Sequence, residues 1–178
     1  MAVTDTLLAL TDFQDIKEMS VNINDARILP YVREAQRIDI VKFLGRALYF
    51  DWMEDQTGGT WVADNYQELF DGASYSDGSN TVQCHGLKLT LLYYSYARFI
   101  KDQDINITSY GNRILSDSDL SEREQMAQIR THERKAISKA IYYQDECRAF
   151  ISANSGDFPL MSSADGTKKM SFQMIKVT

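Results

Sequence analysis

The chain has 178 residues, of which 44% are hydrophobic, so it is long enough to bury a real core within a single domain. Its net charge of −6 excludes a protein that coats nucleic acid with a basic surface, because that mode of binding needs a dense patch of Lys and Arg. No run of about 18 apolar residues occurs, and no basic region precedes the apolar N-terminal residues, so we expect neither a membrane span nor a secretory signal. The two cysteines, Cys84 and Cys147, lack metal-type spacing and favour a reducing compartment.

The first part of the chain predicts a short helix followed by a long helical region. Residues 11–14 resemble a capping box, which predicts a helix to about Met19. Residues 25–53 form the long region, and Pro30 near its beginning places the start of the regular helix near Leu29. We expect a bend near Ile38 and Asp39, and then a second amphipathic helix. Gly45 inside that helix predicts a close approach of another backbone.

Residues 54–85 are the least regular part and predict an acidic, loop-rich insertion, within which residues 64–70 could form a short helix. No Lys or Arg lies between Arg46 and Lys88, whereas seven residues between positions 51 and 77 are acidic. Two interpretations stay open: a solvated loop, or an acidic surface that faces DNA able to slide past it or a basic partner. The residues assigned to this acidic channel or partner face are Asp64, Glu68, Asp71 and Asp77.

Residues 86–100, GLKLTLLYYSYARFI, predict the central helix of the protein. Leu87, Leu91 and Tyr94 follow helical spacing on one face, and Leu89, Leu92 and Tyr96 follow it on another. Apolar residues on both faces indicate a helix with neighbours nearly all round. Alternation at residues 105–110, followed by a Gly-Asn pair, predicts an extended segment that is one arm of a short hairpin.

The last helix is predicted over residues 121–153, with Ser121 as its N-cap and Glu124 completing a capping box. Its apolar stripe runs from Met126 through Ile137 and Ile141 to Ile151. A helix of this length spans about 45 Å, so we expect it to project beyond the core, to bend, or to bury its far end in a partner.

Residues 155–178 predict an extended C-terminal arm, because Gly156 and Pro159 end the helix and residues 170–174 alternate between apolar and polar. A strand without a local mate is what β-augmentation of a neighbouring protein uses. We favour docking on a partner over a disordered terminus. The apolar residues assigned to this arm are Phe158, Met170, Phe172, Met174, Ile175 and Val177.

The sequence carries no recognisable catalytic or metal-binding signature. Cys84 and His85 are adjacent, but adjacency does not position a base for a thiolate, so we expect a local structural role. Asp64, Glu68 and Asp71 have helical spacing and could bind a cation, although a solvated face is the preferred interpretation. We therefore predict no catalytic, metal-binding or cofactor-binding residue.

Two blocks of the sequence resemble the head–tail connector, or adaptor, proteins of tailed bacteriophages. The similarity is to the group found in phages and prophages of Bacteroidetes, including the crAss-like phages. The blocks are ILPYVREAQRIDIVKFLGRALYFDWM and GLKLTLLYYSYARFIKDQDINITSYG, and the matched positions are Glu34-Ala35-Gln36, Leu44-Gly45, Leu48-Tyr49, Gly86-Leu87-Lys88, Tyr93-Tyr94, Tyr96-Ala97-Arg98-Phe99 and Asn106-Ile107-Thr108. The resemblance covers residues 10 to 153, and the acidic region and the tail depart from it.

The resemblance implies a structural virion protein at the head–tail interface, assembled in the cytoplasm of the host bacterium and without catalysis or cofactor. It implies a homo-oligomeric, dodecameric ring that binds the portal protein and tail or second-ring proteins, continues the DNA channel and lies close to packaged double-stranded DNA without base specificity. The arm of residues 155–178 would then bind the portal or a neighbouring subunit.

The fold class predicted is mainly α: a helical bundle over residues 1–154 with a long C-terminal helix, a short β-hairpin or extended segment, and an extended arm. Two other functions are kept as alternatives. One is a small helical metal-dependent hydrolase that uses the acidic residues 51–77, and the other is a phage regulatory or host-interaction protein absent from the virion.

Overall fold

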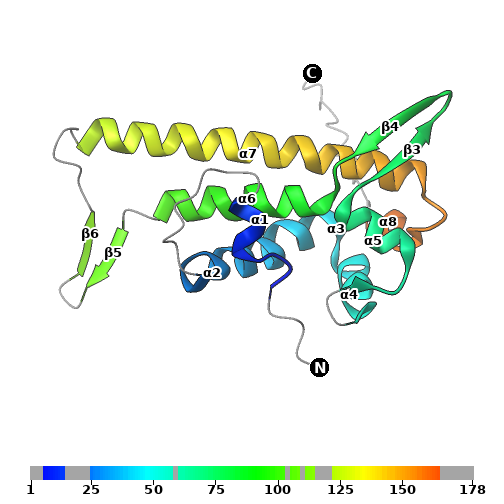
Figure 1. Ribbon diagram of the computed structural model, residues 1–178, viewed down its shortest axis with the longest axis horizontal. Helices are drawn as coiled ribbons and strands as arrows, with labels where there is room; N and C mark the ends of the chain where they lie inside the picture. Colours follow the sequence, from blue (N-terminus) through cyan, green and yellow to red (C-terminus); the bar gives the residue numbers. More distant parts are fainter. Residues whose placement is uncertain are drawn as a thin grey trace, which may run out of the picture.

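The computed structural model of the protein describes residues 6–14, 25–57, 60–102, 105–108, 111–114 and 122–164. These residues are mainly α-helical, as predicted, and one long helix runs along the whole length of the fold (Figure 1). The strands that the structure describes form three separate antiparallel pairs. None of the described helices is both long enough and apolar enough to span a bilayer.

Helix α6 (Gly86–Asp102) is the element around which the others pack. Ten of its 17 residues are buried, and they include Thr90 and Ser95 as well as apolar side chains. The buried hydroxyl of Ser95 donates to the carbonyl of Leu91 over 2.7 Å, which satisfies it within the helix. The prediction of a central helix with neighbours nearly all round is therefore confirmed.

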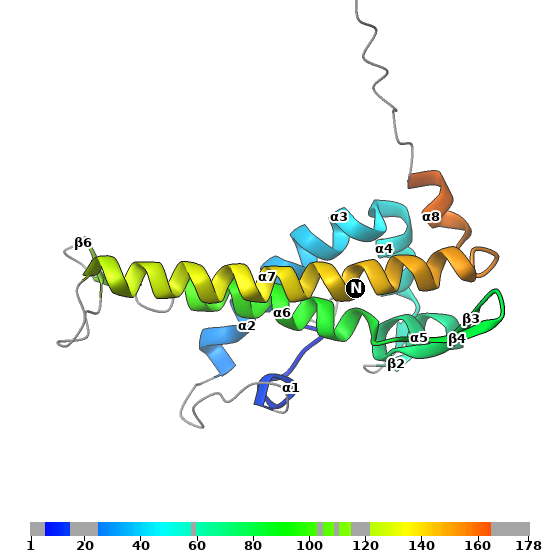
Figure 2. The ribbon, with the colours of Figure 1, turned by 90° about the horizontal axis from the view of Figure 1, so that it is seen from above.

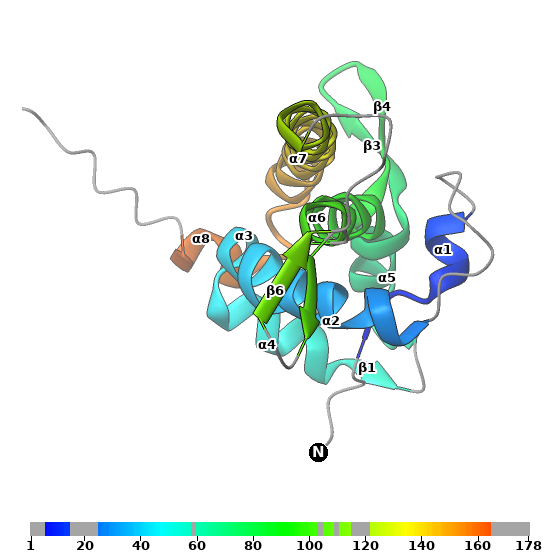
Figure 3. The same ribbon diagram turned by 90° about the vertical axis from the view of Figure 1, so that its left-hand side faces the viewer.

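The helices form layers above and below α6 (Figure 3). Helix α7 (Glu122–Ala153) lies along one side of α6. On the other side lie α2 (Asp25–Ala35), the π-helical segment η1 (Gln36–Ile40), α3 (Val41–Leu44) and α4 (Arg46–Glu54). Helix α1 (Leu10–Gln14) packs on α2 and buries Phe13. The core is thus built mostly from the two faces of α6.

The first long helical region differs in two ways from the prediction. Helix α2 begins at Asp25 rather than near Leu29, so Pro30 lies inside the helix, where a proline removes one intrahelical hydrogen bond. Gly45 does not lie inside a helix: it has φ 76° and ψ 158°, and it separates α3 from α4. A glycine adopts this conformation without the strain that a Cβ would bring. The predicted bend at Ile38 and Asp39 coincides with η1.

Residues 54–57 and 60–85 are mostly helix and strand rather than loop, and the short helix predicted over residues 64–70 is present. They contain the short pair β1 (Gln56–Thr57) and β2 (Thr60–Trp61), helix α5 (Asp64–Asp71), and the hairpin of β3 (Ala73–Asp77) and β4 (Asn80–Cys84). The β3–β4 register runs from Ala73 opposite Cys84 to Asp77 opposite Asn80. Gly78, with φ 63°, supplies the positive φ that such a tight turn needs.

The remaining elements follow the predicted order. Strands β5 (Ile105–Thr108) and β6 (Gly111–Ile114) form the expected hairpin. Helix α7 has 32 residues, within one residue of both predicted ends. Its length is about 48 Å at 1.5 Å per residue, and it extends past α6 at both ends (Figure 2). A short helix, α8 (Pro159–Ala164), follows it.

Candidate interaction surfaces

Stacked aromatic rings hold together the end of the molecule that contains the carboxylates of residues 51–77, which we call the acidic end. The rings of Trp52 and Trp61 are nearly parallel, with centroids 4.9 Å apart and an interplanar angle of 11°. The indole N–H of Trp61 donates to the carbonyl of Trp52 over 2.8 Å, and the ring of Phe70 lies 4.5 Å from that of Trp61. Residues far apart on α4, β2 and α5 therefore hold one another in place.

Two carboxylates of this end are used internally. Oδ2 of Asp55 accepts hydrogen bonds from the backbone N–H groups of Val62 and Ala63, at 3.0 and 2.8 Å, just before α5 begins. Asp51 accepts a hydrogen bond from the hydroxyl of Tyr66. Burial, together with this bond, raises the pKa of Tyr66 above its ordinary value. These contacts orient α5 on the core.

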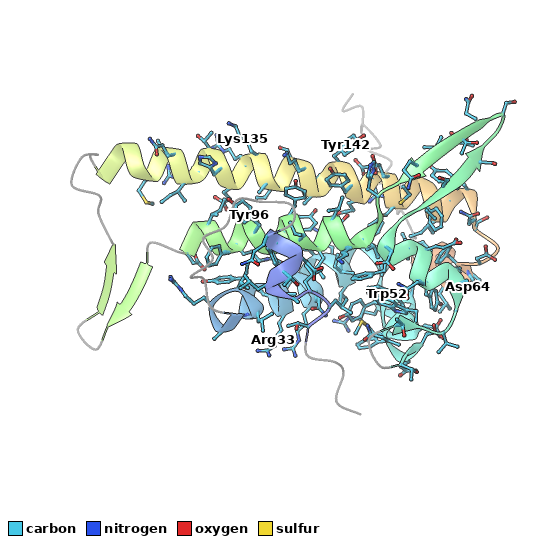
Figure 4. The ribbon with its side chains drawn as sticks, in the orientation of Figure 1. Arg33, Trp52, Asp64, Tyr96, Lys135 and Tyr142 are labelled. Carbon is cyan, nitrogen blue, oxygen red and sulfur yellow. The ribbon has the colours of Figure 1, made fainter. Side chains whose placement is uncertain are left out.

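Helix α5 presents three of the four predicted acidic residues on one exposed face. Its opposite face is buried through Tyr66, Leu69 and Phe70. Asp64, Glu68 and Asp71, at spacings i, i+4 and i+7, therefore share the outer side, and all three are exposed (Figure 4 labels Asp64). We call these three residues the α5 acidic face. Asp77 is also exposed, but it lies at the far end of β3.

The described residues do not neutralise the carboxylates at this end of the molecule. In the described part of the protein, no carboxylate between positions 51 and 77 forms an ion pair with a Lys, Arg or His. The described residues likewise contain no group of three or more His, Cys, Asp or Glu side chains placed to hold a metal ion. The α5 acidic face is thus a surface of uncompensated charge.

Helix α7 carries a second charged surface, which the sequence analysis did not single out. Its inner side is buried on α6 through Ala136, Ala140 and Cys147, with Phe150 and Ile151 near its end. The opposite side is exposed, and no described element covers it when the molecule is seen from above (Figure 2). We call this side the α7 outer face; its residues are Arg130, Arg134, Lys135, Ser138, Lys139, Ile141, Tyr142, Asp145 and Ala149.

Two residues of the predicted apolar stripe of α7, Ile141 and Ala149, lie on its exposed outer side. Ile141 is 46% exposed and lies beside Tyr142, which is 61% exposed. The spacing of Arg130, Arg134 and Ser138 is the signal that could have revealed a polar outer side, because residues four apart share a helix face.

The prediction that Phe158 belongs to a partner-binding arm is wrong. Phe158 is 1% exposed, and its ring lies 6.0 Å from those of both Tyr66 and Phe150. The reason is that the chain turns back after α7. This turn, just before α8, places Phe158 in the core of the acidic end. The other assigned arm residues, Met170, Phe172, Met174, Ile175 and Val177, lie outside the described residues.

Cys84 and His85 do not form a nucleophile and its base. The Cys84 thiol is fully buried 3.9 Å from the thiol of Cys147, and the hydrogen bond between them, with burial, raises the pKa of Cys147. The His85 ring instead pairs with Glu146, with Nδ1 2.7 Å from Oε2. These contacts join the β4–α6 connection to α7, which is the structural role expected of this pair of residues.

A charged cleft of about 280 Å³ lies among α2, α6 and α7. Its centre is Arg98, whose guanidinium pairs with Glu34 over 2.7 Å and with Asp39 over 2.8 Å. Asp39 belongs to η1, so the π-helical turn aims this carboxylate at α6. The cations of the cleft are matched by its own carboxylates, since Lys101 also pairs with Glu133 over 3.4 Å.

The fold and its surfaces define a mainly helical protein with two separate charged faces, one acidic and one basic. The chain belongs to a family described as "Family of unknown function (DUF6712)", whose profile matches residues 40–170 and thus more than half of the chain. That match contains α3 to α8 and includes both faces. No curated protein and no solved structure matches the chain.

Proposed function

We propose that this protein is a structural component of the virion of a tailed bacteriophage, namely a head–tail connector that forms a ring below the portal and continues the DNA channel. The proposal starts from the resemblance of residues 28–53 and 86–111 to such proteins. These residues form α2 to α4 and α6, which are the inner layers of the fold. Proteins of this kind act by binding other proteins and carry out no reaction.

The observation that carries the proposal is the uncovered α7 outer face. A 32-residue helix is buried along one side only, and its other side combines four cations with the exposed side chains of Ile141 and Tyr142. Aromatic residues and arginine are enriched where proteins bind one another. An exposed surface of this composition on a helix that spans the fold favours assembly with other chains.

The α5 acidic face fits a position near packaged DNA or a basic partner. Uncompensated carboxylates repel phosphates, so DNA can pass such a surface without being held. In the proposed ring, the acidic end would therefore contribute to the channel wall or to a contact with another protein. Residues 165–178, with Met170, Phe172, Met174, Ile175 and Val177, would form the arm that binds the portal or a neighbouring subunit.

Mass spectrometry of purified virions tests the proposal against a regulatory or host-interaction protein. We expect the chain in washed particles at a fixed ratio to the portal protein, because a ring contributes a set number of copies. A chain that is abundant in infected cells and absent from purified particles would contradict a structural role.

A truncation tests the arm separately. Because Phe158 and α8 pack on the core, the deletion must begin at residue 165 rather than before α8. We expect the chain lacking residues 165–178 to unfold at the same urea concentration as the full chain and to lose attachment to portal particles. The same attachment by both chains would exclude a role for the arm.

A further inference from the structure

We propose that the α7 outer face of one copy binds the α5 acidic face of a second copy, so that identical chains associate head to tail. This inference deepens the ring arrangement of the proposed function by naming the two surfaces that meet. It can be tested on the isolated protein, apart from any binding to portal or virion.

The α7 outer face offers cations that no other described residue pairs with. Within the described residues, Arg130, Arg134 and Lys135 form no ion pair, whereas Asp145 on the same face is paired with Arg148 over 3.0 Å. Lys139 lies over the ring of Tyr93, with its Nζ 5.3 Å from the ring centroid. The face therefore carries a net positive charge on a chain whose overall charge is −6.

The α5 acidic face has the complementary composition. Asp64 and Glu68 are exposed and form no ion pair in the described part of the chain, and Val62, two residues before α5, is 71% exposed. Both surfaces thus combine exposed apolar side chains with an excess of one charge: Ile141 and Tyr142 lie among cations, and Val62 lies near carboxylates. Such pairing steers association and fixes register.

The two surfaces cannot neutralise each other within one molecule. Lys135 and Tyr142 lie on the side of α7 that faces away from α6, whereas Asp64 lies at the end of the molecule formed by α4, α5 and α8 (Figure 4). Seen along α7, the helix occupies one side of α6 and α5 another (Figure 3). A contact between two different surfaces of identical chains is heterologous, and it closes a ring when the rotation between neighbours allows it.

A second copy fits the α7 outer face better than DNA does. The face includes the carboxylate of Asp145 and the exposed side chain of Ile141, which phosphates would not favour. A second copy supplies the carboxylates of α5 and, two residues before that helix, the exposed side chain of Val62. Binding to DNA is therefore an alternative result of the test below.

Two variants that each lose one surface provide the test. The first is R130E/R134E/K135E, which reverses the α7 outer face, and the second is D64K/E68K, which reverses the α5 acidic face. Sedimentation and light scattering at low ionic strength should show that the wild-type chain self-associates and that each variant alone stays monomeric. An equal mixture should associate again through mixed dimers of one copy of each, because the two intact surfaces are opposite in charge and so are the two reversed surfaces.

A matched control keeps the charge change and moves it elsewhere. Arg27, Lys42 and Arg46 are exposed on α2 to α4, so R27E/K42E/R46E changes the net charge by as much as R130E/R134E/K135E and should associate as the wild type does. We expect the dissociation constant of the mixed dimer to rise by about tenfold or more at high salt. Circular dichroism of every variant should match the wild type, since the substitutions keep helix-forming residues.

Three results would overturn the proposal. These are a wild-type chain that stays monomeric at every concentration, a variant that associates as well as the wild type, or an equal mixture that forms no dimer. Retention of a double-stranded oligonucleotide by the wild type but not by R130E/R134E/K135E, with no change in mass between the two, would assign the face to DNA. A wild-type chain that self-associates but does not bind portal particles would contradict the connector function and leave the contact between the two faces standing.

Discussion

At the scale of single residues, Phe158 shows how much the acidic end depends on the segment after α7. Its ring fills the space between Tyr66 of α5 and Phe150 of α7 at 1% exposure, whereas Phe50 on α4 is 56% exposed. The two phenylalanines allow the same substitution to be compared in a buried and an exposed place.

We predict that Phe158→Ala lowers the free energy of unfolding by about 3 to 5 kcal/mol, because it leaves a cavity in addition to the lost burial. Phe50→Ala should lower it by less than about 1 kcal/mol. Urea titration followed by tryptophan fluorescence measures both, since Trp52 and Trp61 lie in the same end of the fold. Equal effects of the two substitutions would show that Phe158 is not part of the core.

Tyr66 gives a prediction on pH. Its pKa is raised above the ordinary value of 10.0 by burial and by the hydrogen bond to Asp51. The folded state therefore holds the phenolic proton more tightly than the unfolded chain, so this contribution to stability is complete below pH 10 and is lost as the pH rises above it.

Tyr66→Phe should cost roughly 1 kcal/mol at neutral pH, where the hydrogen bond to Asp51 is lost. It should also make the decline in stability above the ordinary tyrosine pKa less steep than in the wild type. Urea titrations from neutral to alkaline pH measure both effects. Parallel curves for the two proteins would contradict a raised pKa at this residue.

Sequence patterns predicted the positions of single residues correctly only where the periodicity of a helix applied. The spacing of Asp64, Glu68 and Asp71 predicted a shared face, and α5 provides it. Phe158 was misplaced because Gly156 and Pro159 ended the predicted helix, and nothing local indicates that the chain turns back onto Tyr66. The exposure of Ile141 depends on how α7 is rotated against α6, which its own sequence does not determine.

At the scale of elements, the acidic end is joined to α6 by the close approach of two glycines. Gly86 has φ 83°, and a Cβ there would lie 2.3 Å from the carbonyl oxygen of Phe70. Gly72 has φ 98°, and a Cβ there would lie 2.6 Å from the carbonyl oxygen of Cys84. The end of α5 and the start of α6 can meet only because neither residue carries a side chain.

We predict that Gly86→Ala destabilises the protein by more than about 2 kcal/mol, because both the positive φ and the backbone contact oppose a Cβ. Gly156→Ala is the matched control, since a Cβ at Gly156 meets no atom within 4 Å. Thermal unfolding followed by circular dichroism compares the two variants. A G86A variant as stable as the control would mean that α5 and α6 do not approach in this way.

The elements with strong periodicity were predicted well, and those held by long-range contacts were not. Helix α6 and both ends of α7 follow from apolar spacing and capping residues, and the β5–β6 hairpin follows from alternation, although Gly111 and Asn112 lie in β6 rather than in a turn. Residues 54–85 looked loop-rich because their first two strands are short and give little local signal, although the short helix over residues 64–70 was predicted. Their order comes from the Trp52–Trp61 stack, which joins residues from separate elements.

At the scale of the whole molecule, the chain separates its charges onto different surfaces. The carboxylates of residues 51–77 gather at one end, while the cations of residues 130–139 lie along α7, and each set lacks a partner of opposite sign in the described part of the chain. The amino-acid composition shows the net charge of −6 but not where the charges lie on the surface. The separation became visible only once the fold placed α5 and α7 on different sides of α6.

The most direct test of the account is the mass of the complex that the full chain forms with portal particles, measured by native mass spectrometry. A ring predicts one dominant species, heavier than the portal by a fixed multiple of 20.4 kDa, with few partly loaded particles. Portal particles that take up no copies, or that take them up one at a time with no preferred number, would contradict the proposed connector.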